Sequence, residues 1–323
     1  MVEQEGRSVM ATESTGLVLV TGGAGFIGSH LVEALLREGR PVRVVDNLAT
    51  GHCENLAHLE GRFEWIEGDL ANFEACREAA RGVECVFHQA AIPSVPRSVA
   101  EPLGSYASGP TATINILEAA RQAGARRFVF AASSSAYGDT VDLPKHESMM
   151  PNPLSPYAAG KLAGEHYVRV YARTMGLDGV SLRYFNVFGP RQDPSSPYSG
   201  VISIFARSMA EGRRPVIYGD GGQTRDFTYV DNVVAANLAA MSAPRPLGGE
   251  ALNIGTGARI SLLDLVGAIN RSLGTDLEPE FRPGRAGDVR DSQADLGRAS
   301  IALGYRPTVD FEEGLRRTLG ASS

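Results

Sequence analysis

The sequence predicts an α/β fold, in which a doubly wound parallel sheet is followed by a smaller C-terminal α/β region. Three observations lead to this prediction. Short apolar segments alternate with amphipathic segments through the first half of the chain, which is typical of parallel strands covered by helices on both faces. A glycine-rich turn directly follows the first apolar segment, and the alternation ends after Asn186, where loops rich in glycine, proline and serine begin.

Right-handed crossovers are expected to connect successive parallel strands of the sheet. The first helix has Ile27, Leu31, Ala34 and Leu35 on one face, and Trp65 is expected in the core. Strands are expected at 17–21, 42–45, 63–67, 85–88, 127–132 and 180–183, and further helices at 114–123 and 156–175. Three parts are expected: a polar tail at 1–15, a cofactor-binding domain at 16–185 with a returning segment near 224–245, and a mainly substrate-binding domain at 186–323.

The composition limits the classes of partner. The 323 residues include 31 Lys and Arg against 37 Asp and Glu, so the net charge is −6, which argues against nucleic acid or an anionic membrane as partner. No run of about 18 apolar residues occurs, and the N-terminus lacks the apolar segment of a signal peptide. The three cysteines show no metal-type spacing, so we expect no metal site and a cytoplasmic protein.

The glycine-rich turn has the sequence TGGAGFIG, with Gly22, Gly25 and Gly28 spaced for close approach of a pyrophosphate to the backbone. Asp46 ends the second expected strand, where a carboxylate accepts hydrogen bonds from an adenosine ribose and would repel a 2′-phosphate. NAD is therefore favoured over NADP. Asp69 and Leu70 follow the third strand and either border the adenine or form an ordinary turn.

A proton-transfer group is indicated by YAAGK at the start of the long helix. Residues four apart share a helix face, so Lys161 lies one turn from Tyr157, where its charge is expected to lower the pKa of the phenol. A tyrosine tuned in this way acts as a general acid or base. The serine run Ser133–Ser134–Ser135 follows the strand at 127–132, at the edge of the sheet where ligands bind.

Together these motifs resemble the extended short-chain dehydrogenase/reductase family, with its Rossmann-like fold, and within it the nucleotide-sugar 4-epimerases. The resemblance covers nearly the whole chain from about Gly16 and includes HQAAIPSVPRS, AASSSAYGD, LSPYAAGK, LRYFNVFGPRQDP, GDGGQTRDFTYVDN and PGRAGDVRDSQAD. It implies that Ser133, Tyr157 and Lys161 are catalytic and that the cofactor is NAD. The implied NAD-binding residues are Gly22, Gly25, Phe26, Ile27, Gly28, Asp46, Asn47, Asp69, Leu70, Gln89, Ala90, Ala91, Tyr157, Lys161 and Tyr184. The implied UDP-sugar-binding residues are Ser94, Ser133, Ser134, Ser135, Tyr157, Asn186, Gln192, Gly200, Tyr218, Arg225, Arg285, Asp288 and Ser292.

The resemblance also implies a mechanism and an assembly. Tyr157 takes the proton of the sugar 4-hydroxyl while hydride leaves C4, the 4-keto sugar rotates, and hydride returns to its other face. Family members are often dimers, so a homodimer is expected, with the helices at 106–123 and 156–175 at the interface.

Other activities of the same fold remain as alternatives: UDP-glucuronate 4-epimerisation, decarboxylation and dehydration, and, more remotely, dinucleotide binding without turnover. Related dehydratases resemble a pattern with Asp-Glu where this chain has Ser134 and Ser135, and hydroxyls cannot replace carboxylates as acid and base. Asn186 resembles the residue of hexose and N-acetylhexosamine epimerases. Ser292 matches a position where a bulky residue excludes N-acetyl sugars, so activity on both UDP-Glc/UDP-Gal and UDP-GlcNAc/UDP-GalNAc is expected.

Four further positions lie outside the implied catalytic, NAD-binding and UDP-sugar-binding residues. Pro93 and Gly109 depart from the pattern of the relatives beside the sugar and the cofactor, respectively. His88 is expected to be a packed strand-end residue. Arg97 either reaches a phosphate or pairs with Glu101.

Overall fold

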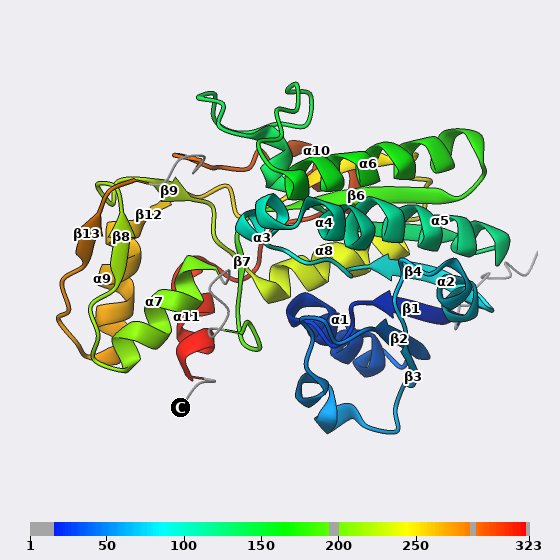
Figure 1. Cartoon of the computed structure of the whole chain (residues 1–323), viewed down its shortest axis with the longest axis horizontal. Helices are drawn as coiled ribbons and strands as arrows, with labels where there is room; N and C mark the ends of the chain where they lie inside the picture. Colours follow the sequence, from blue (N-terminus) through cyan, green and yellow to red (C-terminus); the bar gives the residue numbers. More distant parts are fainter. Residues whose placement is uncertain (1–15, 194–199, 285–288, 321–323) are drawn as a thin grey trace, which may run out of the picture.

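Seven strands form the central sheet of the computed structural model, which describes residues 16–193, 200–284 and 289–320 (Figure 1). They are β1 (Leu17–Thr21), β2 (Val42–Asp46), β3 (Glu64–Glu67), β4 (Val83–His88), β5 (Arg127–Ser133), β6 (Asp178–Tyr184) and β11 (Glu250–Ile254). The order across the sheet is β11-β6-β5-β4-β1-β2-β3, and every pairing is parallel. The predicted doubly wound parallel sheet is confirmed, and β11 extends it from the second half of the chain.

Two apolar cores lie on opposite faces of this sheet because successive side chains of a strand point in opposite directions. In β1, Val18 and Val20 belong to one core and Leu19 to the other. The first core contains apolar residues of α1 (Phe26–Arg37) and α8 (Val230–Ser242). The second contains those of α2 (Phe73–Ala80), α5 (Ala112–Gln122) and α6 (Pro156–Thr174).

Short helical segments occupy the loops at the carboxyl edge of the sheet. They are the 3₁₀ turns η1 (Cys53–Asn55), η2 (Ala57–Leu59) and η4 (Ser134–Tyr137), and the helices α3 (Val95–Ala100) and α4 (Pro102–Tyr106). A π-helical turn, η3 (Ala107–Thr111), joins α4 to α5 and contains Pro110. Proline has no N–H to donate, so a local departure from α-helical bonding is expected at this position.

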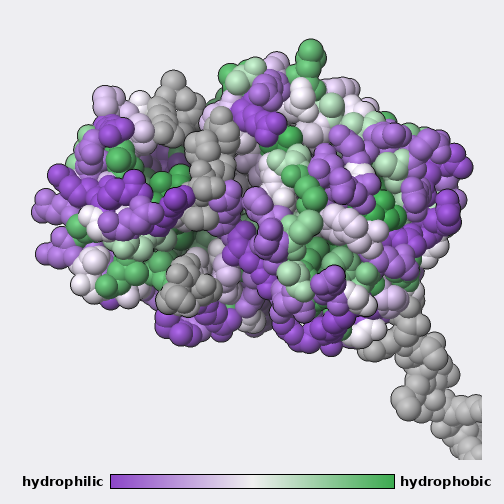
Figure 2. All heavy atoms as spheres, turned by 60° about the horizontal axis from the view of Figure 1, so that its bottom comes forward, coloured by the Kyte–Doolittle hydropathy of each residue, from purple (hydrophilic) through white to green (hydrophobic). Residues whose placement is uncertain are grey.

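Most of the remaining elements form the smaller part at the left of Figure 1, whereas α10 (Gly297–Leu303) packs against β11 and α8 of the larger part. The others are β7 (Val187–Phe188), α7 (Val201–Ala210), β8 (Val216–Tyr218), β9 (Thr224–Arg225), β10 (Thr228–Tyr229), β12 (Ile260–Ser261), α9 (Leu262–Leu273), β13 (Glu280–Arg282) and α11 (Phe311–Gly320). Three two-stranded pairs occur here, β10-β7, β12-β9 and β13-β8. The surface in Figure 2 is hydrophilic over much of the outer edges of both parts.

One core prediction is wrong. Trp65 is 38% exposed, because β3 is the last strand of the sheet and most of its side chains face solvent. In the described part of the chain, no helix combines the length and the apolarity needed to span a bilayer.

Candidate active site

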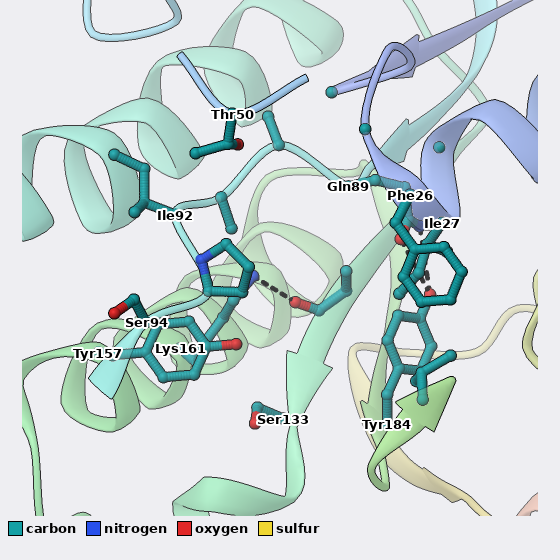
Figure 3. A pocket seen from close by; sticks show the side chains of 18 of the residues that line it. Phe26, Ile27, Thr50, Gln89, Ile92, Ser94, Ser133, Tyr157, Lys161 and Tyr184 are labelled. Atoms are coloured by element: carbon teal, nitrogen blue, oxygen red, sulfur yellow. Dashed lines mark hydrogen bonds between the residues drawn. The ribbon is translucent and has the colours of Figure 1, made fainter. Parts of the chain in front are cut away.

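A cavity of about 910 Å³ opens at the carboxyl edge of the sheet, where ligands bind in doubly wound folds. Residues at or just after the ends of β1 to β6 line it. In Figure 3, Phe26, Ile27 and Tyr184 lie at one end of the view and Tyr157, Lys161 and Ser133 lie together nearer the other. The parallel sheet therefore brings the glycine turn and the proton-transfer residues to one cavity.

The glycine turn leaves no space for larger side chains. Gly22 has a positive φ of 66°, and a Cβ on Gly28 would lie 2.1 Å from the carbonyl oxygen of Gly22. Gly25 precedes α1 as its N-cap residue, with no side-chain cap hydrogen bond. The turn thus forms a backbone cradle at a helix N-terminus, which suits a pyrophosphate.

The Asp46 carboxylate is fixed beside this cradle. Its Oδ2 accepts a hydrogen bond from the amide of Ala24 at 3.0 Å and its Oδ1 accepts one from Leu48 at 2.8 Å. Each carboxylate oxygen can accept more than one hydrogen bond, so a ribose diol fits here. Asn47, Asp69 and Leu70 also line the cavity, and the Asp69 carboxylate caps its own turn through the amide of Ala71.

Tyr157 and Lys161 lie at the start of α6, which begins after a serine cap. The Ser155 hydroxyl accepts from the amide of Ala158, and Pro156 occupies the first turn, where its missing N–H costs nothing. The Nζ of Lys161 donates to the carbonyl oxygen of Ala131 at 2.7 Å and lies 6.0 Å from the centre of the Tyr157 ring. The helix therefore places both side chains on the cavity side, as the spacing predicts.

The pKa shifts of Lys161 and Tyr157 do not match the expected lowering of the pKa of the phenol. Burial lowers the pKa of Lys161 to about 8, while Glu165 opposes the shift. Burial raises the pKa of Tyr157, and the neighbouring Ser133 hydroxyl offsets only part of the effect. The expected lowering of the Tyr157 pKa by Lys161 is thus not found in the protein alone, where desolvation dominates the shift and Ser133 is the group that opposes it.

The serine run forms the turn after β5. The Ser133 hydroxyl accepts hydrogen bonds from the amide of Ser135 at 3.2 Å and from its hydroxyl at 2.8 Å. All three serines line the cavity. Ser133 therefore presents its hydroxyl beside the phenol of Tyr157, where a substrate oxygen can be bound (Figure 3).

A buried amide that the sequence analysis missed holds Tyr184. The side chain of Asn237, in α8, donates to the Tyr184 hydroxyl at 2.8 Å, and Gln89 lies within hydrogen-bonding distance of both. Asn237 is fully buried, and burial raises the pKa of Tyr184 to about 12. Tyr184 therefore stays a neutral wall of the cavity. In the sequence, an asparagine within an otherwise apolar helical pattern could have indicated a buried polar contact of this kind.

His88 is a packed strand-end residue, as expected. Its Nδ1 lies 2.8 Å from the Thr21 hydroxyl and its Nε2 lies 3.0 Å from that of Thr113. Burial lowers the pKa of His88 to about 3, so the ring is neutral. Arg97 pairs with Glu101 at 3.3 Å, as one of its two interpretations expects, and it also lines the cavity, so that contact with a phosphate stays a prediction.

On the substrate side, Asn186 and Ser292 are joined directly. The Asn186 amide donates to the Ser292 hydroxyl at 3.2 Å and to the carbonyl oxygen of Asp226 at 3.1 Å. Ser292 is buried and lines the cavity with a small side chain. The structure therefore places a small polar residue next to the asparagine.

The other predicted substrate residues lie in three places. Ser94, Gln192, Gly200 and Arg225 line the cavity, whereas Tyr218 lies in β8 and is not among the lining residues. Arg285 and Asp288 lie outside the described residues. The Gln192 side chain accepts from the Ser203 hydroxyl at 2.5 Å and packs against Gly200, where a Cβ would lie 3.1 Å from its amide nitrogen.

All of the predicted cofactor residues line this one cavity, and unpredicted side chains join them, among them those of Thr50, Lys145 and Arg191. Pro93 lines the cavity as well, and Gly109 lies in the π turn with open space where a side chain would be. Among the described residues, no group of three or more His, Cys, Asp or Glu is arranged to hold a metal ion.

Comparisons with known proteins agree with this geometry. Residues 18–255 match the model of the NAD dependent epimerase/dehydratase family. The UDP-glucose 4-epimerase of Mycolicibacterium smegmatis is 42% identical, over 93% of this chain and 96% of its own length. The UDP-glucuronate 4-epimerase of Thermodesulfobacterium geofontis is 34% identical, over 95% and 96%. The solved UDP-N-acetylglucosamine 4-epimerase of Methanobrevibacter ruminantium, in complex with UDP-N-acetylmuramic acid, is 38% identical, with a TM-score of 0.90 and coverage of 95% and 98%.

Proposed function

Because the chain belongs to the NAD-dependent epimerase/dehydratase family, we propose that it interconverts UDP-Glc with UDP-Gal, and UDP-GlcNAc with UDP-GalNAc, at carbon 4. One observation carries the proposal: the hydroxyl groups of Tyr157 and Ser133 and the Lys161 ammonium converge on the cavity that also holds the glycine cradle and Asp46. That arrangement suits proton transfer next to a bound dinucleotide.

The residues present fit NAD. The Gly22–Gly28 backbone offers a diphosphate cradle whose tight turn a Cβ at Gly28 would disrupt by colliding with the Gly22 carbonyl, and Asp46 suits a ribose diol and disfavours a 2′-phosphate. Lys161 and Tyr184 would border the nicotinamide end. When bound, NAD supplies a reversible hydride acceptor for C4 of the sugar.

Tyr157 performs the proton transfer in this proposal. Its phenolate takes the proton of the 4-hydroxyl during oxidation and returns a proton to the C4 oxygen during reduction. Ser133 donates a hydrogen bond to the same oxygen, and the charge of Lys161 favours the phenolate. Since burial raises the pKa of Tyr157, loss of its proton needs positive charge nearby, which Lys161 provides in part.

The UDP end of the substrate is assigned to Arg225, with Arg285 and Asp288 as further contacts. A guanidinium binds phosphate oxygens in pairs, so a local cation suffices although the net charge is −6. Tyr218 is assigned to the nucleotide, and Ser94, Ser134, Ser135, Asn186, Gln192, Gly200 and Ser292 to the sugar side. Ser134 and Ser135 disfavour a dehydratase, which needs carboxylates there, and Asn186 favours a neutral sugar over a uronate.

The experiment is incubation of the purified protein, without added reductant, with UDP-Glc, UDP-Gal, UDP-GlcNAc, UDP-GalNAc and UDP-GlcA separately. The anomeric protons are followed by NMR. We expect conversion within the hexose pair and within the N-acetyl pair. Conversion of UDP-GlcA alone would replace the proposal with the uronate alternative, and no conversion of any sugar would favour a dinucleotide-binding protein without turnover.

We also propose that the protein is a homodimer in the cytoplasm, with neither nucleic acid nor membrane as partner. Large apolar side chains are exposed on adjoining helices, Leu103 and Tyr106 of α4 and Tyr167 and Val170 of α6, and Leu103 is 85% exposed. Such side chains suit a helical interface between two copies. Light scattering should give twice the monomer mass, and Leu103→Asp should shift it toward the monomer.

A further inference from the structure

A buried ion pair lies next to Lys161, and the mechanism above does not use it. Glu165 is one helical turn beyond Lys161 in α6, and Arg183 lies in β6. Arg183 donates two hydrogen bonds to the Glu165 carboxylate, at 2.8 and 2.7 Å, and the two side chains are only 4% and 3% exposed. Burying two charges is costly, and many such pairs can be replaced by apolar residues without loss of stability, so a role beyond stability is worth testing.

The same pair also reaches the serine turn. The Arg183 guanidinium lies over the ring of Tyr137, 4.7 Å from its centre. Tyr137 ends the turn η4 that follows Ser133, and its hydroxyl donates to Asn253 at 2.6 Å. The ion pair therefore connects the helix that carries Lys161 with the turn that begins after Ser133.

The surroundings of Lys161 provide little other support for its charge. On its own helix it faces Tyr157 and Glu165, and on β5 it faces the Ala131 carbonyl and the Phe130 ring, 5.0 Å from Nζ. On β4 it faces His88, whose low pKa leaves it neutral. Among these groups, Glu165 is the carboxylate, and it is the one paired with Arg183.

We propose that Glu165 and Arg183 are positioning residues for proton transfer, acting on Lys161 with opposite signs. The Glu165 carboxylate keeps the Lys161 ammonium charged in its buried setting. Arg183 holds that carboxylate in place and, as a cation, limits its effect on Lys161. The role in catalysis rests on the proposed function, whereas the electrostatic effect on Lys161 does not.

The test measures the pKa of Lys161 itself, by ¹³Cε chemical shift against pH, with the resonance assigned from Lys161→Met. Glu165→Gln should lower this pKa and Arg183→Gln should raise it, each by about half a unit or more. If the pair has only a structural role, the two substitutions should shift the pKa of Lys161 in the same direction or leave it unchanged. Identical titrations of both variants and the wild type would overturn the proposal.

A second buried ion pair, between β5 and β6, provides the matched control. Arg127 of β5 and Asp178 of β6 lie 2.9 Å apart at the opposite end of these strands, away from the cavity. Asp178→Asn should lower the free energy of unfolding to an extent comparable with Glu165→Gln but leave the pKa of Lys161 unchanged. An equal shift in Asp178→Asn would contradict the proposal.

Two further measurements keep the test decisive. If the glutamine variants do not fold, Arg183→Lys serves instead, since an ammonium lacks the planar fork that holds both carboxylate oxygens and should leave the Glu165 carboxylate freer to act on Lys161. The Lys161 pKa should rise in this variant, and a wild-type value would refute the proposal.

In an active enzyme, Glu165→Gln should move the basic limb of the profile of kcat against pH to lower pH, with KM for the UDP-sugar nearly unchanged. Absence of any turnover in the wild type would refute the proposed function and leave the NMR result valid.

Discussion

The ammonium of Lys161 and the carbonyl oxygen of Ala131 lie 2.7 Å apart. This hydrogen bond ties the helix that carries Tyr157 to the strand that ends at Ser133, so the groups assigned to proton transfer are held on one rigid unit. Such placement on helix and strand, rather than on a free loop, favours a fixed geometry for the reaction.

Removing the phenol hydroxyl tests the assigned base. Tyr157→Phe should lower kcat for epimerisation by about 10²–10⁴-fold, because the variant has no group to exchange the proton of the 4-hydroxyl. Bound NAD, measured after denaturing the purified protein, should remain. The control Tyr167→Phe removes a hydroxyl from the same helix at a position that does not line the cavity, and should leave kcat unchanged. Full activity in Tyr157→Phe would show that the base is wrongly assigned.

The space at Ser292 is expected to set the range of sugars. Ser292→Tyr should lower kcat/KM for UDP-GlcNAc by at least about 10-fold relative to UDP-Glc, because a bulky ring fills the room of the N-acetyl group. Ser292→Ala keeps that room while removing the hydrogen bond with Asn186, and should retain both activities. An unchanged ratio in the tyrosine variant would mean that the N-acetyl group lies elsewhere.

The Asn237–Tyr184 contact should contribute to stability as a pair. Asn237→Ala leaves the Tyr184 hydroxyl and the Gln89 amide without their buried partner, so the free energy of unfolding should fall by about 1–3 kcal/mol. Urea unfolding of this variant, of Tyr184→Phe and of the double variant checks the coupling. Strictly additive losses in the double variant would contradict a direct interaction.

His88 makes stability depend on pH. The pKa of His88 in the folded protein, about 3, lies below its ordinary value of 6.5, so between these values the unfolded chain binds a proton that the folded protein excludes. The free energy of unfolding should therefore fall as the pH decreases, by about 1–2 kcal/mol from this group between pH 6.5 and 5.

Urea unfolding at both pH values compares wild type with His88→Gln, in which this part of the pH dependence should disappear. His166→Gln removes an exposed histidine of α6 and is the matched control. Equal pH dependence in wild type and His88→Gln would show that His88 titrates alike in both states.

The sheet and much of the site could be predicted from the sequence, because parallel strands bring their carboxyl ends to one edge. Gly22, Asp46 and Tyr157 are far apart in sequence, yet each follows a strand or begins a helix at that edge. The partners of Asn237 and the place of β11 in the sheet could not be predicted, since both are set by tertiary packing, although the asparagine stands out in an apolar helical pattern. Trp65 was assigned wrongly, because apolar character alone does not identify an edge strand.

The most direct test of the account is retention of the hydrogen at C4. UDP-Glc carrying deuterium at C4 is incubated with the purified protein in ordinary water, without added NADH, and the product is analysed by NMR and mass spectrometry. If hydride leaves C4 and returns within one active site, UDP-Gal should form with the deuterium retained at C4. UDP-Gal that has exchanged its C4 deuterium with solvent would contradict the account.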